Sequence, residues 1–529
     1  MKRKLAATGV SAVVIVIVIL VVINLISVNV FGRLDLTEGD IFSLSESSKE
    51  LVRNLDDRIT VKCYFSEDLD PPYNANARYV KDQLDEYRSY SGGNLSFSFI
   101  DPIKEKKEQE AQSYRIPAVP MQTLRRDKME IKQVFMGIVI LYEDKQEVIP
   151  VVQNTATLEY EITRAIRKLT SSVTPKVAFT EGHSELDLKS NMTYVDKVLG
   201  QEFEVQTIDL KSTKVVPADI QTIYVVGPQT PFSQWELYQL DQFLMRGGKL
   251  GLLIDRIQAE IQQGFAQPMD PGFDAFLTHF GINVNSNMVI DAQCAQIAVQ
   301  QQQGQFRFQS LKEYPLFPRV TEFSTENLIV KQLESINLIF ASTLDTTRFQ
   351  STPLTFEVLA RTSKNSGILV PPYNIDPMRQ WTKADFVTPP QPVGVAITGN
   401  FTSFFAGKPK PDMDTIMADN LAAIPETRLD SGDQGRMVVW SDADFVSDQV
   451  LRDQSNLIMF QNMTDWLSQD QGLISIRSKD VTARPLKQTE DSTRTLVKFI
   501  NIFLMPAVVI VFGVARWQIR KQNRRRQLI

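Results

Sequence analysis

The chain is poor in the residues that disulfide-rich and metal-binding proteins depend on. Its 529 residues include only two cysteines and two histidines. Cys63 and Cys294 could form one disulfide, but two cysteines so far apart make no disulfide framework. A catalytic zinc site usually has three protein ligands, often with two histidines, whereas His183 and His279 lie in unrelated motifs. We therefore expect no resident metal and no cofactor.

The sequence also lacks the features of a nucleotide motor or a nucleic-acid binder. No G-x-x-x-x-G-K-[S/T] loop is present to cradle ATP phosphates, so energy would have to come from a partner. Nine of the 57 basic residues lie in the two ends of the chain, which leaves 48 basic against 62 acidic residues elsewhere. The nine are Lys2, Arg3, Lys4, Arg516, Arg520, Lys521, Arg524, Arg525 and Arg526. An acidic body does not suit phosphate contacts, and we expect no nucleic-acid partner.

Two uncharged segments, one near each end, predict membrane spans. Residues 5–32 carry no charge and are longer than the ~7–15 apolar residues of a cleaved signal peptide, which is the alternative for this segment. Residues 499–515 are also uncharged, and a terminal amphipathic helix is the alternative there. Because a span needs ~20 apolar residues, we expect transmembrane helices over residues 5–30 and 496–515.

The basic ends predict the orientation of these spans. Lys and Arg next to a span stay on the cytoplasmic side, so the tails 1–4 and 516–529 are both expected inside. The bulk of the chain would then lie in the periplasm, anchored in a bacterial inner membrane by a helical hairpin. The three arginines 524–526 could instead bind anionic lipid or a cytoplasmic partner.

Residues 37–170 predict a first extracytoplasmic domain. Ser43 and Glu46 form a capping-box signature that begins a helix. Hydrophobic periodicity then predicts strands at 59–65 and 95–100, helices at 75–90, 104–114 and 158–169, and a hairpin of 134–142 with 146–152. This order resembles a thioredoxin-like fold. Its redox motif is missing, because there is no C-x-x-C and Cys63 lies inside a strand. A binding or spacer role fits better.

Residues 174–480 predict a larger α/β domain. Strands at 175–180, 203–208, 220–226 and 249–254 alternate with helical segments such as 234–245, which favours a parallel sheet with crossover helices. The strand at 436–440 and the helix at 456–467 should return to this sheet. The domain would therefore be discontinuous, with an insertion of about 257–430. Glutamines in residues 257–310 predict a mobile stretch around a short helix at 273–280.

Polar residues follow the predicted strands of this second domain. Ligands on such sheets bind at the carboxyl ends of the strands. The candidates are Glu181, Gly182, His183, Glu185, Gly227, Asp255, Asp442 and Asp444. Their alternative roles are structural: a tight turn at Gly182 and helix capping by the aspartates.

Residues 182–186 partly match the nucleophile elbow G-x-S-x-G but lack the final glycine. The domain resembles class I glutamine amidotransferases, yet Asp255 follows the strand where their nucleophilic cysteine would stand. That departure argues against amidotransfer.

Five motifs in order resemble the gliding-motility auxiliary (GldG-like) family. They are LDLTEGDIFSLS at 34–45, VAFTEGHSE at 177–185, YQLDQFLMRGGK at 238–249, WSDADF at 440–445 and LISIR at 473–477. Members of this family are auxiliary components of ABC-type transport systems, whose permease and ATPase are normally separate chains. The resemblance implies those partners, and in gliding bacteria a link to motility. The second domain is also similar to one shared with an intraflagellar-transport protein.

These observations predict a non-enzymatic, membrane-anchored auxiliary subunit of an ABC transporter complex. Its extracytoplasmic part would couple to, or recruit, cargo or envelope partners. One alternative is an extracytoplasmic protein that captures a small molecule, sugar or peptide at the strand ends. A second alternative is an envelope hydrolase that uses Ser184 or His183. The expected fold is α/β throughout, with two spans flanking a thioredoxin-like domain and a parallel-sheet domain.

Overall fold

The computed structural model describes residues 43–468, apart from 68, 72, 126–127, 154, 156, 172–173, 304–305, 332, 352, 414–427 and 452–453, and also residues 476, 498–500, 503, 506, 512–514 and 516–517. The chain divides into two units, residues 1–481 and 482–529. The first predicted span and the N-terminal tail lie outside the described residues, as do most of the second span and, apart from Arg516, the basic residues of the C-terminal tail.

Within the described residues, the helices are all too short or too polar to cross a bilayer.

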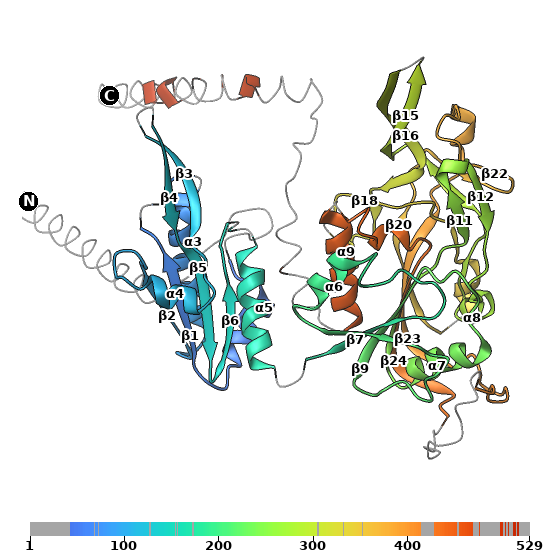
Figure 1. Cartoon of the computed structure of the whole chain (residues 1–529), viewed down its shortest axis with the longest axis horizontal. Coiled ribbons are helices and arrows are strands. Elements are labelled where there is room, and N and C mark those ends of the chain that lie inside the picture. The colour runs from blue at the N-terminus through green and yellow to red at the C-terminus, as the bar shows by residue number, and fades with distance from the viewer. Residues whose placement is uncertain are drawn as a thin grey trace, which may run out of the picture. The chain divides into compact units, whose positions relative to one another are not determined.

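The first part of the chain folds around a four-stranded sheet. In chain order its elements are α2 (Glu46–Arg53), β1 (Ile59–Phe65), α3 (Asn76–Tyr90), β2 (Leu95–Ile100), α4 (Glu108–Ser113), β3 (Val119–Arg125), β4 (Lys128–Val134), β5 (Met136–Tyr142), β6 (Lys145–Ile149) and α5 (Leu158–Thr170). The sheet order is β2-β1-β5-β6, in which β1 and β2 run parallel and β5 runs antiparallel to β1 (Figure 1). The two predicted strands, β1 and β2, are confirmed to the residue.

Several details of this part differ from the prediction. The cap of α2 is Ser45, whose side chain accepts from the backbone N–H of Ser48, and not Ser43. Helix α4 is shorter than expected because Asp101 holds the preceding residues in a turn, where its Oδ1 accepts from the backbone of Ile103 and Lys104. The β3–β4 hairpin was not predicted.

The second part contains an eight-stranded sheet of order β17-β20-β23-β24-β10-β9-β7-β8. Its strands and the helices that cover it are β7 (Lys176–Thr180), α6 (Thr193–Leu199), β8 (Glu204–Ile208), β9 (Ile220–Val226), α7 (Gln234–Met245), β10 (Lys249–Leu253), α8 (Asp274–His279), β17 (Glu322–Phe323), β20 (Thr355–Arg361), β23 (Pro392–Thr402), β24 (Ser431–Trp440) and α9 (Gln454–Leu467). Neighbouring strands from β8 to β24 pair in parallel, and β23, β20 and β17 continue the sheet antiparallel.

Side chains alternate between two cores along the central strands. On one face Phe179, Tyr224 and Trp440 pack with α6 and α9, and on the other Ile223 and Val439 pack with α7 and α8. Both faces of the sheet are thus covered by helices, with α6 and α9 together on one side (Figure 1). This double burial explains why the central strands are continuous apolar runs.

Strand β24 returns to the parallel sheet, as the sequence predicted. It pairs with β10 from Lys249↔Arg436 to Leu253↔Trp440. A long segment between these two strands supplies the antiparallel strands and several small sheets. The parallel part of the sheet is therefore assembled from two separate stretches of chain.

The glutamine-rich stretch contains a regular hairpin that the sequence analysis did not predict. Residues Cys294–Gln303 form strand β15, which pairs antiparallel with β16 (Phe306–Val320) in a long hairpin (Figure 1). Ala295, Ile297 and Val299 are half-buried, while the alternate residues Gln296 and Ala298 are exposed. The period of two that defines a strand was present, but glutamine occupied its polar face.

Candidate functional site

The parallel strands bring the predicted site residues to one edge of the sheet. Strands β7, β9, β10 and β24 end at Thr180, Val226, Leu253 and Trp440. Because adjacent pairs are parallel and in register, the residues that follow them meet at the same carboxyl edge. All eight candidates lie in these segments. The structure then separates them into an aspartate cluster, a buried histidine network and an exposed loop.

Asp255, Asp442 and Asp444 form the aspartate cluster. Asp255 Oδ1 accepts from the backbone N–H of Ala443 at 2.7 Å, which ties the end of β10 to the segment after β24. Asp442 accepts from the N–H of Ile339 at 2.6 Å and from that of Asp444 at 2.8 Å. Asp442 thereby joins the sheet edge to the inserted segment and closes the turn after β24.

Gly227 lets this cluster form. Its φ is +61°, and a Cβ there would stand 3.1 Å from both Asp255 Oδ2 and the Cβ of Ala443. Only glycine combines that backbone conformation with so close an approach at little cost. Gly227 is thus a structural residue of the edge.

The aspartate cluster holds protons more tightly than isolated carboxyls. Burial raises the pKa of Asp255 and of Asp442 well above the ordinary value, and the neighbouring carboxyls raise both pKa values further. Burial also raises the pKa of Asp444 to about 6. Two effects that disfavour the charged form, desolvation and like-charge repulsion, act together here.

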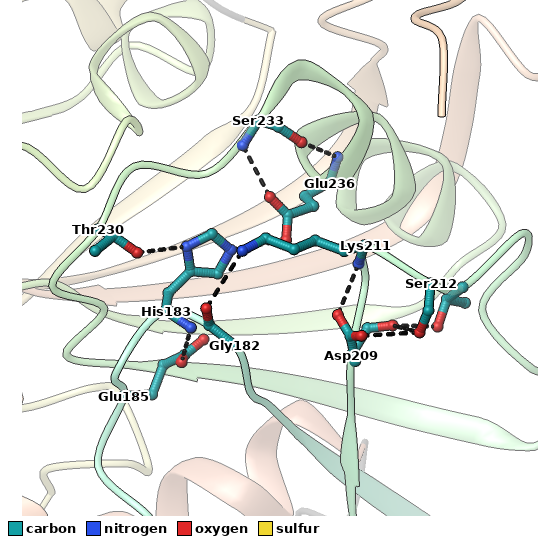
Figure 2. Close-up of polar contacts among 10 residues, drawn as sticks. Gly182, His183, Glu185, Asp209, Lys211, Ser212, Thr230, Ser233 and Glu236 are labelled. Atoms are coloured by element: carbon teal, nitrogen blue, oxygen red, sulfur yellow. Dashed lines mark hydrogen bonds and ion pairs between the residues drawn. The ribbon is translucent and has the colours of Figure 1, made fainter. Parts of the chain in front are cut away.

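His183 is buried, with only 2% of its surface exposed. Its Nε2 lies 2.7 Å from Glu236 Oε1, and its Nδ1 lies 2.9 Å from Thr230 Oγ1 (Figure 2). The His183 ring also stacks on Phe232, with 4.1 Å between the ring centroids. Both ring nitrogens are thus occupied by Glu236 and Thr230. The ring has no nitrogen left with which to take a proton from Ser184, so the histidine–serine geometry that a hydrolase needs is not formed.

Glu236 connects this network to helix α7. Its Oε2 accepts from the backbone N–H of Ser233, and the Ser233 hydroxyl accepts from the N–H of Glu236, which completes a capping box (Figure 2). Burial alone would raise the pKa of Glu236, but hydrogen bonds from His183 and Ser233 together hold it below the ordinary value. An ionised Glu236 at the helix N-terminus therefore anchors the loop that carries His183.

The sequence reasoning missed Thr230, Ser233 and Glu236 as members of this network. The available signal was the S-x-x-E spacing of Ser233 and Glu236 before an apolar helix. That signal identifies the cap but gives no hint that a histidine from another loop binds to it.

Residues 181–188 form an exposed loop around a small cavity. The cavity measures about 120 Å³ and is lined by Thr180, Glu181, Gly182 and Glu185, among others. Glu185 Oε2 accepts from the backbone N–H of His183 at 2.6 Å, and the Gly182 carbonyl accepts from Lys211 Nζ at 3.3 Å (Figure 2). The buried hydroxyl of Thr180 has no hydrogen-bond partner. The cavity is smaller than the ~300–1,000 Å³ typical of ligand pockets.

Within the described residues, no group of three or more His, Cys, Asp or Glu residues is placed to hold a metal ion. Cys63 and Cys294 are not bonded to each other. Burial raises the pKa of Cys63, and burial together with Glu313 raises that of Cys294 to about 11, so both thiols stay protonated near neutral pH.

These observations define a mixed α/β protein with a doubly covered, largely parallel sheet, whose carboxyl edge is polar, acidic and internally bonded. The profile of a family described as "ABC-type uncharacterized transport system" matches residues 174–472. The chain belongs to this family, which associates it with ABC-type transport systems. A domain of unknown function, DUF7088, matches residues 38–141.

The chain is also similar to an uncharacterized protein of Borreliella burgdorferi, with 21% identity over 517 residues that cover 94% of this chain and 95% of the relative. Two solved structures resemble it over about half its length. The "mmIFT52 N-terminal domain" has a TM-score of 0.33 and 14% identity, covering 55% of this chain and 97% of that one. A putative ThuA-like protein from Bacteroides uniformis has a TM-score of 0.30 and 11% identity, covering 56% and 93%.

Proposed function

We propose that the protein is a non-enzymatic, membrane-anchored auxiliary subunit of an ABC transporter complex. The observation that carries this proposal is the family match across the whole eight-stranded domain, in a chain whose sequence has no loop for ATP phosphates. The permease and the ATPase would be separate chains. ATP-driven motion in those partners would reposition the α/β domains, which recruit cargo or an envelope protein.

The uncharged segments 5–30 and 496–515 support a helical hairpin anchor in the bacterial inner membrane, with both basic tails in the cytoplasm. The sheet order β2-β1-β5-β6 supports a thioredoxin-like first domain that binds or spaces rather than reduces. The motif order supports the narrower assignment to gliding-motility auxiliary proteins, with motility as one use of the system.

The carboxyl edge suits a rigid recognition surface better than a reaction centre. His183 and Glu236 are engaged with each other, and Asp255 and Asp442 accept backbone hydrogen bonds. The His183–Glu236 contact fixes the partly exposed loop 181–188, and the two aspartates fix the segments that follow β10 and β24. Preorganisation of this kind lowers the entropic cost of binding a partner.

Affinity purification of the tagged full-length chain from native membranes in mild detergent tests the assembly. We expect an ATPase and a permease to copurify with it. The control is a second membrane protein that carries the same tag and is expressed at the same level. Recovery of the chain alone, or of the same proteins with the control, would contradict an auxiliary role.

An alternative is the capture of a small extracytoplasmic ligand in the cavity at residues 181–188, whose volume of about 120 Å³ restricts it to a ligand smaller than those of typical pockets. Thr180, Glu181 and Glu185 would supply its polar contacts. Thermal unfolding of the full-length chain with a panel of sugars, amino acids and short peptides tests it. A ligand that raises the Tm of the wild-type protein but not of Glu181→Gln would support capture. The absence of any such ligand in the panel would favour the scaffold.

A further inference from the structure

The hairpin of β15 and β16 projects from the second part of the chain (Figure 1). The strand order of its sheet is β15-β16-β18, so β15 lies at the edge. Among the described strands, only β16 pairs with β15. An edge strand of this kind presents a row of backbone N–H and C=O groups with which a further strand can pair.

The free edge of β15 is regular and is held at its base. Its register with β16 runs without a shift from Gln296↔Glu313 to Gln303↔Phe306, and the one irregularity lies before Gln296. Ile297 packs against the small core around Tyr314 and Leu316, which fixes the hairpin to the domain. Residues 296–303 therefore offer an ordered template for pairing.

Strand β15 lacks the features that protect exposed edges. Natural sheets discourage pairing at an edge with charged residues, prolines or bulges. Residues 296–303 read QIAVQQQQ and contain neither a charge nor a proline. The partner strand β16 has both, namely Arg307, Lys312, Glu313, Pro315, Pro318 and Arg319. One strand of the hairpin is thus protected against further pairing, and the other is open to it.

The composition of this edge matches a second copy of itself. An uncharged strand offers no ion pair to a charged partner strand. A glutamine amide both donates and accepts hydrogen bonds, so one glutamine complements another. Two identical strands that pair antiparallel about a two-fold axis keep the same faces on the same side of the sheet, because side chains alternate with a period of two.

One register satisfies this symmetry best. With Ala298 at the two-fold axis, Gln296 faces Gln300 of the second copy, and Ile297 faces Val299. The two glutamines are exposed on one face, and the two β-branched residues are half-buried on the other. Such matched cross-strand pairs stabilise a sheet. A register centred on Val299 would instead oppose Ala298 to Gln300 and lose both matched pairs.

We propose that the free edge of β15 pairs antiparallel with β15 of a second copy of this chain, with Ala298 at the two-fold axis. The pairing uses both open edges, and the protected strands β16 lie on the outside. The contact is therefore closed, and assembly through it stops at two copies. The inference rests on neither the proposed membrane anchor nor the ABC partners.

Sedimentation velocity of the full-length chain in mild detergent, over a series of protein concentrations, tests the inference. We expect a monomer–dimer equilibrium. Ala298→Lys would place two ammonium groups on directly opposite residues, whose Cβ atoms are about 5 Å apart in a sheet. Repulsion between like charges near a protein surface should then raise the Kd of the dimer by about tenfold or more.

Leu311→Lys is the matched control. Leu311 is the register partner of Ala298 on β16, and it is 71% exposed. The control thus adds the same charge to the same hairpin, but one strand away from the paired edge. Its Kd should stay close to that of the wild type. Equal weakening by the two lysine variants would overturn the proposed edge.

A charge reversal at the same position guards against a variant that merely fails to fold. Ala298→Glu alone should weaken the dimer as Ala298→Lys does. An equimolar mixture of the two variants should restore it, because each lysine then faces a glutamate. Recovery of this kind requires that position 298 of one copy meets position 298 of the other. A mixture that stays as monomeric as its components would overturn the register.

A disulfide measures the proximity directly. Ala298→Cys in a Cys294→Ser background should give a covalent dimer on mild oxidation, detected on a non-reducing gel. Leu311→Cys in the same background should not. The remaining thiol, Cys63, is fully buried and is common to both variants.

Two further outcomes would overturn the inference. The first is a wild-type chain that stays monomeric at every concentration. The second is a dimer that Ala298→Lys leaves intact, because its contact would lie elsewhere in the chain. Copurification of an ATPase and a permease with a monomeric chain would leave the auxiliary role standing and remove only the β15 interface.

Discussion

The two edges of the parallel sheet carry opposite charges. The carboxyl edge has three aspartates, Asp255, Asp442 and Asp444. The amino edge has three cations, Lys249, Arg436 and Arg246. The aspartates point inward and hold the chain together, since Asp255 and Asp442 accept backbone hydrogen bonds from segments far apart in sequence. Arg246 and Lys249 instead line a cavity of about 290 Å³ at the amino edge. The charges of the carboxyl edge therefore join segments of the chain, whereas two charges of the amino edge border a cavity.

Helix geometry accounts for part of this difference. Crossover helices begin at the carboxyl edge and end at the amino edge, so the first edge faces the positive ends of helix dipoles and the second faces the negative ends. Acids at one edge and bases at the other are therefore locally favoured. The comparison predicts that substitutions of the bonded residues at the carboxyl edge lower the stability of the fold, whereas removal of a buried charge at the amino edge leaves it unchanged or raises it.

The largest expected effect is at Glu236. Glu236→Ala removes both the partner of buried His183 and half of the α7 capping box, and breaking such a buried pair costs about 3 to 5 kcal/mol. We expect a clear fall in the Tm of the full-length chain in detergent. Glu181→Ala, at an exposed carboxylate of the same edge, is the matched control. Equal stability of the two variants would contradict the cohesive role of this edge.

A smaller loss is expected from Gly227→Ala. The new Cβ would meet Asp255 and Ala443 at 3.1 Å in a left-handed backbone, which costs roughly 2 to 3 kcal/mol. Gly247→Ala provides the control, because its φ is also positive but no atom lies within 4 Å of the new Cβ. The difference in Tm between the two variants measures the crowding alone. A difference near zero would mean that Asp255 and Ala443 can shift away from the new Cβ at little cost in stability.

The aspartate cluster should also make the free energy of unfolding depend on pH. The pKa of Asp444 is raised to about 6, so the folded protein binds this proton more tightly than the unfolded chain does. The bound proton contributes fully to the free energy of unfolding below pH ~3.9, the pKa of Asp444 in the unfolded chain. This contribution is lost as the pH rises through 6. Asp444→Asn should therefore gain up to roughly 2 kcal/mol relative to wild type between pH 4 and pH 8. A constant difference across that range would exclude a raised pKa.

The smallest effect, and one of opposite sign, is expected at the amino edge. Lys249→Met removes a positive charge that burial and the nearby Arg436 disfavour. The free energy of unfolding at pH 7 should therefore stay constant or rise by up to about 1 kcal/mol, and the Tm should not fall. A loss of several kcal/mol would show that Lys249 is needed for folding, and would remove the contrast between the two edges.

The sequence predicted the main strands and helices well, but it did not predict the side-chain contacts between distant segments. Strands such as β1 and β9 and helix α7 were predictable because their apolar periodicity is strong and uninterrupted. The gathering of Asp255, Asp442 and Asp444 at one edge followed from parallel strand order alone. The His183–Glu236 contact could not be predicted, because no periodicity links a loop after one strand to the cap of a helix 53 residues later.

The Gln-rich hairpin illustrates the other limit. Composition suggested a mobile segment, yet the half-buried residues Ala295, Ile297 and Val299 alternate with the exposed residues Gln296 and Ala298, as a strand requires. The alternation of buried and exposed side chains was thus a better predictor of the local structure than the high glutamine content.

The insertion within the sheet has a consequence for how the protein is made. Asp255 and Ala443 are hydrogen-bonded across 188 positions of sequence, and β24 completes the sheet centre only after all of the intervening chain has been synthesised. At ~5–20 residues per second, β10 waits about 10 to 40 s for its neighbour. During that interval its apolar edge is open to pairing with other chains. Strand β10 therefore has to be kept from pairing with other chains until β24 has been synthesised.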